Sequence, residues 1–326
     1  MRYKMLTVFL LFLLLGFTSV NLENDNVAIS YAADLPSWKA GPAKFNIINF
    51  VNAVSNPSSP MYVQSEHRRA FFDMDGTLLC EKPDYIEVVV CRQRLLEKVR
   101  DNPALAQQAI YRAVLDNDTK YLHTHVKDAI LEAFAGESLT SYLAYCRNFL
   151  KSHRHPRLNL EYTRLFYLPM IELIDYLQQA DFSVYLVSTS QQEFIRSLSP
   201  GIIAVPKQNI IGTMVAFVLQ NIDEDAPHVF VRTRQYFQPY NADKNKVVRL
   251  RERGLLPGII AVGNSMGDYA MLDGVSDNGL PNLVCIVDHD DPEREYEYHK
   301  VDLLTKAAKR KWLVISIKKD FRVVFQ

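Results

Sequence analysis

Residues 71–79, FFDMDGTLL, constrain this chain more than any other stretch. An apolar run stops at two carboxylates one residue apart, Asp73 and Asp75, and a glycine follows. Such a run predicts a buried β-strand that delivers side chains at its carboxyl end, where open α/β sheets hold their ligands. Both carboxylates would leave the strand on one face, where they repel each other unless a cation lies between them or one holds a proton. The stretch therefore predicts a metal-assisted site with one nucleophilic and one proton-transferring carboxylate, and a solvated turn is the alternative.

Composition allows a large globular core and gives no sign of a nucleic-acid partner. The chain has 326 residues, of which 48% are hydrophobic, and this suits one or two domains. The formal net charge is zero and no basic block occurs, so we expect no nucleic acid as partner.

The amino-terminal residues predict export. Arg2 and Lys4 precede an uncharged, mostly apolar run over residues 5–20. A basic start followed by a short apolar core is typical of a signal peptide. The run is shorter than the ~20 residues that a membrane-spanning helix needs. We therefore expect a signal peptide over residues 1–20 and a periplasmic or secreted protein, with an uncleaved membrane anchor as the alternative.

The motif DMDGT resembles the first motif of the haloacid dehalogenase (HAD) superfamily, most of whose members transfer phosphoryl groups through an aspartyl-phosphate. True dehalogenases of that superfamily lack the second Asp, because a halide leaves without a proton whereas an alkoxide needs one. Asp75 therefore implies phosphate ester chemistry. The resemblance implies an α/β fold with a Rossmann-like parallel sheet.

Residues 80–162 are predicted to be mostly helical. Within them, residues 138–153 place apolar side chains at i, i+3, i+4, i+7, i+10 and i+11, which gives one apolar helix face. In HAD proteins an insertion after the first motif is a cap domain that closes over the site and selects the substrate. The resemblance thus implies a core domain over 33–79 and 163–326, a helical cap over 80–162, and a small phosphorylated metabolite as substrate.

Two later motifs match the family's order. The predicted strand over residues 182–187 ends at Ser188, the position of the second motif, while Ser190 and Glu193 have the spacing of a helix capping box. The third motif requires a lysine that opens a helix, and Lys246 fits this better than Lys244.

The segment GNSMGD, residues 263–268, resembles the fourth motif, with metal-directed positions at Asn264 and Asp268. The commonest form carries an acid where this chain has Asn264, although an amide oxygen can also bind Mg²⁺. Ser265 and Asp268 also have the spacing of a helix cap. Glu81 lies near the place where phosphoserine phosphatases carry a substrate-binding glutamate. The wider chain is similar to phosphoserine-phosphatase-like bacterial HAD hydrolases, in particular at LPSW, FYLPMIELIDYL, GNSMGD and DPEREYEY.

Other chemistry-bearing residues have a plainer interpretation. The cysteines show no CxxC spacing and are expected to be core or incidental thiols; they are Cys80, Cys91, Cys146 and Cys285. Two histidine pairs, His123 with His125 and His153 with His155, are assigned to the cap surface because that spacing turns helical side chains apart. Residues 289–291 are expected to form a solvated turn.

The resemblance implies a Mg²⁺-dependent phosphomonoesterase. Its implied residues are Asp73 as nucleophile, Asp75 as acid and base, Ser188 and Lys246 on the phosphate, and Asp73, Asp75, Asn264 and Asp268 at the metal. One alternative is a phosphotransferase of the same fold. The other is a HAD scaffold that has lost its activity and acts as a binding protein. The acidic and basic residue types that the motifs require are still present, which argues against this alternative.

Overall fold

A computed structural model describes residues 35–198, 201–221 and 228–326, and residues 35–326 form one compact unit. The predicted signal peptide over residues 1–20 lies outside the described residues, so the expected export stays a prediction. Within the described ranges, no helix has the length and apolar character that crossing a bilayer requires.

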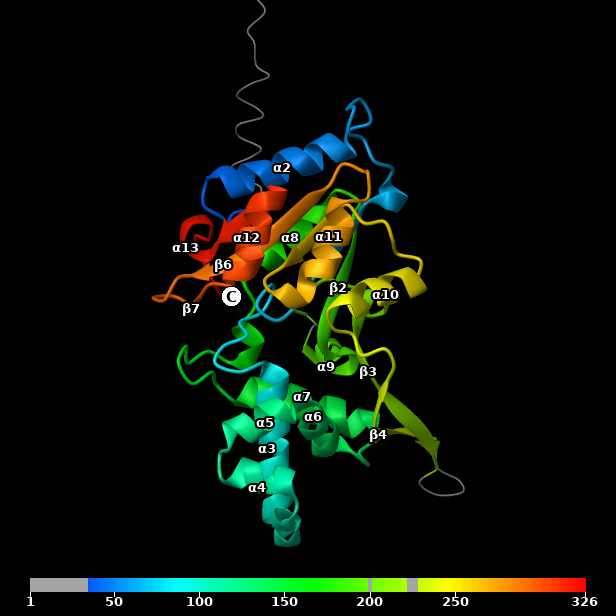
Figure 1. Cartoon of the computed structure of the whole chain (residues 1–326), viewed down its shortest axis with the longest axis vertical. Coiled ribbons are helices and arrows are strands. Elements are labelled where there is room, and N and C mark those ends of the chain that lie inside the picture. Colours follow the sequence, from blue (N-terminus) through cyan, green and yellow to red (C-terminus); the bar gives the residue numbers. More distant parts are fainter. Residues whose placement is uncertain (1–34, 199–200, 222–227) are drawn as a thin grey trace, which may run out of the picture. The chain divides into compact units, whose positions relative to one another are not determined.

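An eight-stranded, mostly parallel sheet forms the centre of the fold (Figure 1). The strands follow the order β4-β3-β2-β1-β5-β6-β7, and β8 pairs with β6. Only β4 and β7 run antiparallel to their neighbours. The strands are β1 (Arg69–Phe72), β2 (Ser183–Gln191), β3 (Ile210–Gln220), β4 (Val229–Phe237), β5 (Ile260–Gly263), β6 (Leu283–Asp290), β7 (Glu297–Tyr298) and β8 (Leu313–Ser316). The predicted α/β class with a Rossmann-like parallel core is confirmed.

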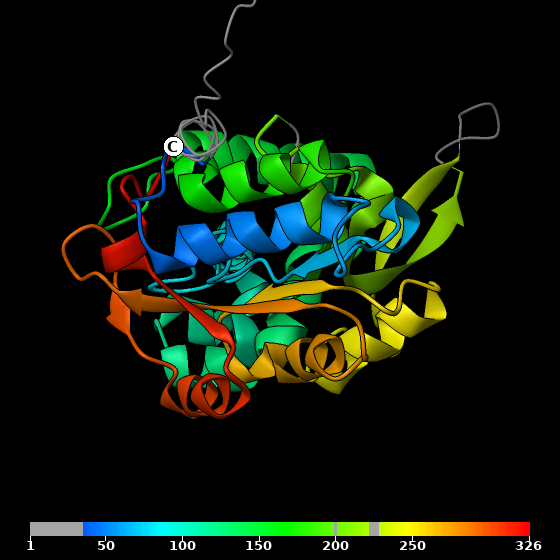
Figure 2. The same cartoon turned by 90° about the horizontal axis from the view of Figure 1, so that it is seen from above.

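Helices cover both faces of this sheet (Figure 2). One face carries α2 (Pro42–Ser55), α8 (Leu168–Gln179) and α9 (Gln192–Leu198). The other carries α10 (Lys244–Glu252), α11 (Tyr269–Ser276) and α12 (Val301–Arg310), and the short α13 (Ile317–Asp320) follows β8. Because both faces of β1 are covered, it is an uninterrupted apolar run, and Phe71 and Phe72 are fully buried.

The strand order reverses direction beside β1. The chain passes from β1 to β2 and β3 on one side, and then returns to β5 and β6 on the other. In open α/β sheets such a reversal leaves a crevice at the carboxyl ends of the strands, which is where ligands bind. Asp73 directly follows β1 and therefore lies at this crevice.

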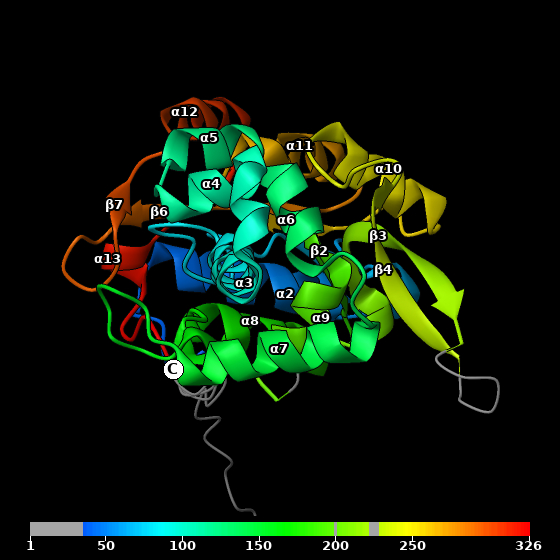
Figure 3. The same ribbon diagram turned by 90° about the horizontal axis from the view of Figure 1, so that it is seen from below.

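The helical insertion lies at the carboxyl end of the sheet (Figure 1, Figure 3). It consists of α3 (Ile86–Asp101), α4 (Ala109–Leu115), α5 (Thr119–Thr124), α6 (Val126–Phe134) and α7 (Leu139–Ser152). The Ser138 side chain caps α7 by accepting a hydrogen bond from the Ser141 amide. The mostly helical character predicted for residues 80–162 is confirmed, and these residues belong to the same compact unit as the sheet.

The insertion is hydrogen-bonded to the edge strand β4. The Gly136 amide donates to the Arg232 carbonyl, and the Arg232 amide donates to the Glu137 carbonyl, both over 2.9 Å. The Arg232 guanidinium also lies 3.9 Å from the centroid of the Tyr142 ring on α7. The turn before α7 thus partners part of an edge that would otherwise present free amides and carbonyls.

Candidate active site

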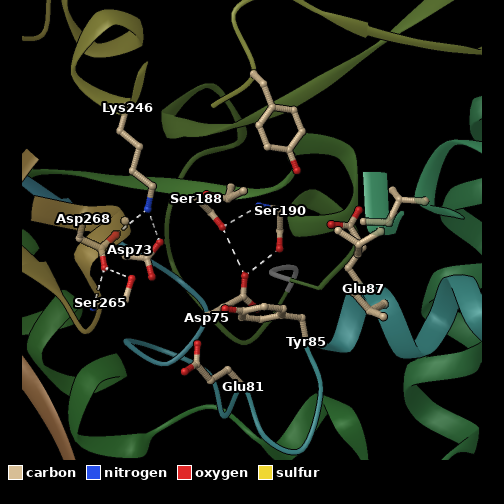
Figure 4. A pocket seen from close by; sticks show the side chains of 16 residues that line it. Asp73, Asp75, Glu81, Tyr85, Glu87, Ser188, Ser190, Lys246, Ser265 and Asp268 are labelled. Carbon is tan, nitrogen blue, oxygen red and sulfur yellow. Dashed lines mark hydrogen bonds and ion pairs between the residues drawn. The ribbon is translucent and has the colours of Figure 1, made fainter. Parts of the chain in front are cut away.

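A cavity of about 340 Å³ opens at the carboxyl end of β1, between the sheet and the insertion (Figure 4). Six of the residues predicted for the site line this cavity: Asp73, Asp75, Glu81, Ser188, Lys246 and Asp268. Asn264 does not line it but is buried beside Gly76. The insertion adds residues that sequence reasoning did not single out, among them Tyr85, Glu87 and Ile130.

Lys246 forms two short ion pairs at the centre of the site. Its Nζ lies 2.6 Å from Asp73 Oδ1 and 2.6 Å from Asp268 Oδ1 (Figure 4). Burial lowers the pKa of Lys246, but the two carboxylates raise it by more, to above its usual range, so the ammonium stays charged. Lys246 lies in the first turn of α10 and faces inward, whereas Lys244 is exposed. The preference for Lys246 over Lys244 therefore agrees with the geometry.

Asp268 has hydrogen-bond donors on both carboxylate oxygens. Lys246 Nζ donates to Oδ1. Oδ2 accepts from the backbone amide of Ser265 at 3.0 Å, from the Ser265 hydroxyl at 3.1 Å and from the backbone amide of Asn264 at 3.1 Å. This is the capping box expected from the spacing of Ser265 and Asp268. With both oxygens engaged, Asp268 is placed to orient Lys246 and has little capacity left for direct metal binding.

Asp75 has one engaged oxygen and one free oxygen. Its Oδ2 accepts from the Ser190 hydroxyl at 2.7 Å and from the Ser188 hydroxyl at 3.4 Å. Its Oδ1 is buried without a hydrogen bond. Burial raises the pKa of Asp75 to about 6, against the hydrogen bond from Ser190, which lowers it. Asp75 can therefore hold or release a proton near neutral pH.

The predicted role of Ser190 as a helix cap is wrong. The strand β2 continues to Gln191, beyond the predicted end at residue 187, so Ser190 lies within a strand. Its hydroxyl points to Asp75, because strand alternation places Ser188 and Ser190 on the same face. The parallel partner β1 ends opposite Leu186, and the loop that follows it brings Asp75 to both hydroxyls.

Negative charge is in excess around Asp73. Burial raises the pKa of Asp73 well above its usual value, and Asp268 and Asp75 raise it further, while Lys246 opposes them. One ammonium thus faces three buried carboxyl groups. An additional cation would relieve this charge.

The donor atoms fit a hard divalent cation. Among the described residues no three His, Cys, Asp or Glu side chains are arranged as a metal cluster. Mg²⁺, however, is bound in proteins through only one or two carboxylates plus water and phosphate oxygens. Asn264 Nδ2 is buried without a hydrogen bond, and Asn264 Oδ1 accepts only a 3.4 Å contact from Thr77. Turning the Asn264 amide over would place its oxygen where the unpartnered nitrogen now lies.

Gly76 is required at this point of the loop. Its φ is +75°, and a Cβ there would lie 1.9 Å from Asn264 Nδ2. A side chain would therefore be strained in its backbone and would displace the Asn264 amide.

His289 supports the same loop from behind, and the prediction of a solvated turn at residues 289–291 is wrong. The side chain of His289 is 1% exposed. Its Nε2 donates to the Gly76 carbonyl over 2.8 Å, and its Nδ1 lies 3.3 Å from Glu295 Oε2. The strand β6 extends to Asp290, so these polar residues continue into the fold. No local sequence signal marks this contact, because it joins residues more than 200 positions apart.

The assignment of His155 to the cap surface is also wrong. His155 is 2% exposed, and its Nε2 donates to the Lys82 carbonyl over 2.6 Å. Its Nδ1 accepts from the amides of Arg157 and Leu158. The expectation of core thiols is confirmed, because all four cysteines are free and buried.

A family model described as haloacid dehalogenase-like hydrolase matches residues 70–273, a range that contains all four predicted motifs. No curated protein matches the chain. The chain is similar to the solved structure of a protein of unknown function from Bordetella pertussis Tohama I, with 18% identity and a TM-score of 0.52. That match covers 76% of this chain and 98% of the other.

A conserved protein of unknown function from Anaerococcus prevotii DSM 20548 is similar at 15% identity and a TM-score of 0.52, covering 83% of this chain and 90% of the other. These two likenesses support the fold. A phosphoserine phosphohydrolase-like protein from Francisella tularensis subsp. tularensis SCHU S4 has 17% identity and covers 73% of this chain and 98% of its own. Its TM-score of 0.39 is too low to bear on the fold.

Proposed function

Because this chain belongs to the haloacid dehalogenase-like hydrolases, we propose that it is a Mg²⁺-dependent phosphomonoesterase that acts on a small phosphorylated metabolite through an aspartyl-phosphate. Two unlike carboxyl groups in one cavity support this proposal most directly. Asp73 is paired with an ammonium, whereas Asp75 is held by hydroxyls and has a pKa of about 6. A nucleophile and an acid–base group need this difference in environment.

In the first step, a carboxylate oxygen of Asp73 attacks phosphorus and the bond to the leaving oxygen breaks. Asp75 gives its proton to that oxygen, so that the product leaves as a neutral alcohol. Lys246 and the hydroxyl of Ser188 lie beside the reacting carboxylates and offset the charge that develops on the phosphoryl oxygens.

In the second step, Asp75, now a carboxylate, takes a proton from a water molecule that attacks the aspartyl-phosphate. The bond between Asp73 and phosphorus breaks, inorganic phosphate leaves, and both carboxyl groups return to their starting states. The hydroxyl of Ser190 holds Asp75 in place through both steps.

The residues proposed to hold Mg²⁺ are Asp73, the backbone carbonyl of Asp75 and the side chain of Asn264. When bound, the ion supplies positive charge to the phosphate oxygens. Asp268 is proposed to orient Lys246 instead of binding the ion directly, since protein donors occupy both of its oxygens.

Hydrolysis of p-nitrophenyl phosphate by the wild-type chain and by Asp73→Asn tests this function. We expect turnover that requires Mg²⁺, disappears with chelator, and falls by at least ~10⁴-fold in Asp73→Asn, because no other group can form the covalent intermediate. Asp101→Asn, at the exposed end of α3, is the matched control and should retain full activity.

Rapid acid quenching followed by mass spectrometry should show one phosphoryl group on the peptide that contains Asp73. Turnover by Asp73→Asn close to that of the wild type would refute the assignment. Turnover without any phosphorylated peptide would refute the covalent route.

A further inference from the structure

The active-site cavity is rich in acids. Five carboxyl groups line it, and Lys246 is the one cationic side chain among the described lining residues. Lys246 is already committed to Asp73 and Asp268. A phosphate monoester dianion and a divalent cation would cancel each other in charge. The remaining acids, Glu81 and Glu87, are therefore available to the rest of the substrate.

Glu87 lies across the cavity from Lys246, on the far side of Asp75 (Figure 4). It is 3% exposed, and its Oε2 accepts from the Gln191 amide over 3.1 Å. Its Oε1 is buried without a hydrogen bond. Glu81 is 4% exposed and likewise has a buried Oε1 without a hydrogen bond. Unpartnered buried acceptors cost free energy, which a ligand that donates to them would recover.

The cations nearest to these acids do not enter the cavity. Lys300 Nζ lies 3.7 Å from Glu81 Oε1, but Lys300 is outside the lining. Arg232, which acts electrostatically on Glu87, donates to Gln191 Oε1 and lies over the Tyr142 ring. Lys300 therefore offsets part of the charge of Glu81 from outside, and neither cation is among the lining residues that a bound anionic group would meet.

The cavity lining also includes apolar and aromatic side chains. These are Tyr85, Val88, Val126, Ile130 and Tyr240. Tyrosine rings attract cations through their negative faces, and aliphatic walls accept alkyl groups. Acids, aromatic rings and aliphatic side chains together suit an ammonium group that carries hydrocarbon.

We propose that the leaving group carries an ammonium, so that the substrate class is a phosphorylated amino alcohol. This inference rests on the phosphatase function proposed above and names its substrate class. A carboxylate or a second phosphate on the leaving group would be repelled by Glu81 and Glu87. No unpaired cationic side chain among the described lining residues would bind it.

Charge selectivity is measured with three phosphate esters. Choline phosphate carries the cation, 3,3-dimethylbutyl phosphate is its neutral isostere with carbon in place of nitrogen, and 3-phosphoglycerate carries a carboxylate. We expect kcat/KM for choline phosphate to exceed that for the isostere by about tenfold or more, since a buried ammonium gains both carboxylate and aromatic contacts. The glycerate ester should be slower than the isostere.

Glu87→Gln tests the residue. Burial raises the pKa of the Glu87 carboxyl to about 8, so the variant is compared with the wild type at pH 9, where Glu87 is charged. The substitution keeps the shape of the side chain and removes that charge, so the ratio of kcat/KM between choline phosphate and the isostere should fall by about fivefold or more. Asp101→Asn removes a charge from the same helix about 20 Å away and should leave the ratio unchanged. An unchanged ratio in Glu87→Gln would remove Glu87 from the recognition of the cation.

Binding to Asp73→Asn separates this inference from the phosphatase function. Titration calorimetry with Mg²⁺ compares the affinities of choline phosphate and the isostere without any need for turnover. Equal affinities would overturn the inference even if p-nitrophenyl phosphate is hydrolysed by the wild type. Tighter binding of choline phosphate, with no ester hydrolysed by the wild type, would support the cation site and refute the phosphatase.

Discussion

Asp75 differs from its neighbour Asp73 in its hydrogen-bond partners. Two serine hydroxyls engage one of its oxygens and the other is buried without a hydrogen bond, so the carboxyl group can exchange a proton without losing its position. The second acid of the motif predicts this role from the sequence alone. The hydroxyl of Ser190 could not be predicted, because it depends on how far β2 continues beyond its apolar residues.

Asp75→Asn tests the acid role through the leaving group. Loss of the proton donor should lower kcat/KM for an alkyl phosphate by on the order of 10²–10⁴. The loss should be much smaller for p-nitrophenyl phosphate, whose phenolate leaves without a proton. Equal losses for the two esters would contradict an acid role and point to a structural one.

The pH dependence of kcat/KM tests the same acid role of Asp75. The pKa of Asp75 is raised to about 6, so its proton-bearing form declines as pH rises above that value. In the wild type, the ratio of kcat/KM for the alkyl ester to that for the aryl ester should therefore fall above about pH 6. In Asp75→Asn the ratio should be independent of pH.

At the scale of elements, the carboxyl end of β6 supports the loop after β1, residues 73–79. His289 donates to the Gly76 carbonyl and faces the buried Glu295. Glu295 in turn accepts from the Tyr167 hydroxyl over 3.0 Å. This network lies behind the loop that carries Asp73 and Asp75, so it acts on them through backbone position.

His289→Ala should lower kcat by about tenfold with a smaller change in KM, because the Gly76 carbonyl loses its donor and the loop loses its alignment. His289→Gln retains a donor and should recover part of kcat. The exposed His299 offers a control through His299→Ala. If the Ala and Gln variants have the same kcat at matched thermal stability, the donor does not position the loop.

Elements with a local signal were predictable. The apolar run that precedes the first motif became β1, and the apolar face over residues 138–153 became α7. Lys246 was predictable because the family resemblance requires a lysine near the start of a helix. The contacts of His289 and His155 were not, since each bonds a backbone carbonyl far along the chain and leaves no periodic pattern near itself.

At the scale of the whole molecule, His155 joins the segment after α7 to the segment between β1 and α3 through the Lys82 carbonyl. Two amides point at its Nδ1, so this nitrogen must accept, and the ring is neutral with its hydrogen on Nε2. Burial lowers the pKa of His155 from 6.5. Protonation would break both amide contacts.

The folded chain therefore binds fewer protons at His155 than the unfolded chain below about pH 6.5. The contribution of this residue to the free energy of unfolding is complete above pH 6.5 and is lost as pH falls through the lowered pKa. His155→Gln should lose about 1–3 kcal/mol at pH 7.5. Urea unfolding at pH 7.5 and 5.5 should show a smaller decrease in the variant than in the wild type, and an equal decrease would exclude His155 as the cause.

The backbone pairing between residues 136–137 and Arg232 also bears on recombination between relatives. A chimera that receives only the helical insertion from another protein would leave β4 with unmatched amides and with an arginine that has lost its tyrosine ring. A chimera that receives only the β3–β4 hairpin would leave the insertion without its anchor. The two segments are joined by these contacts despite their separation along the chain, so a graft of either one should carry the other with it.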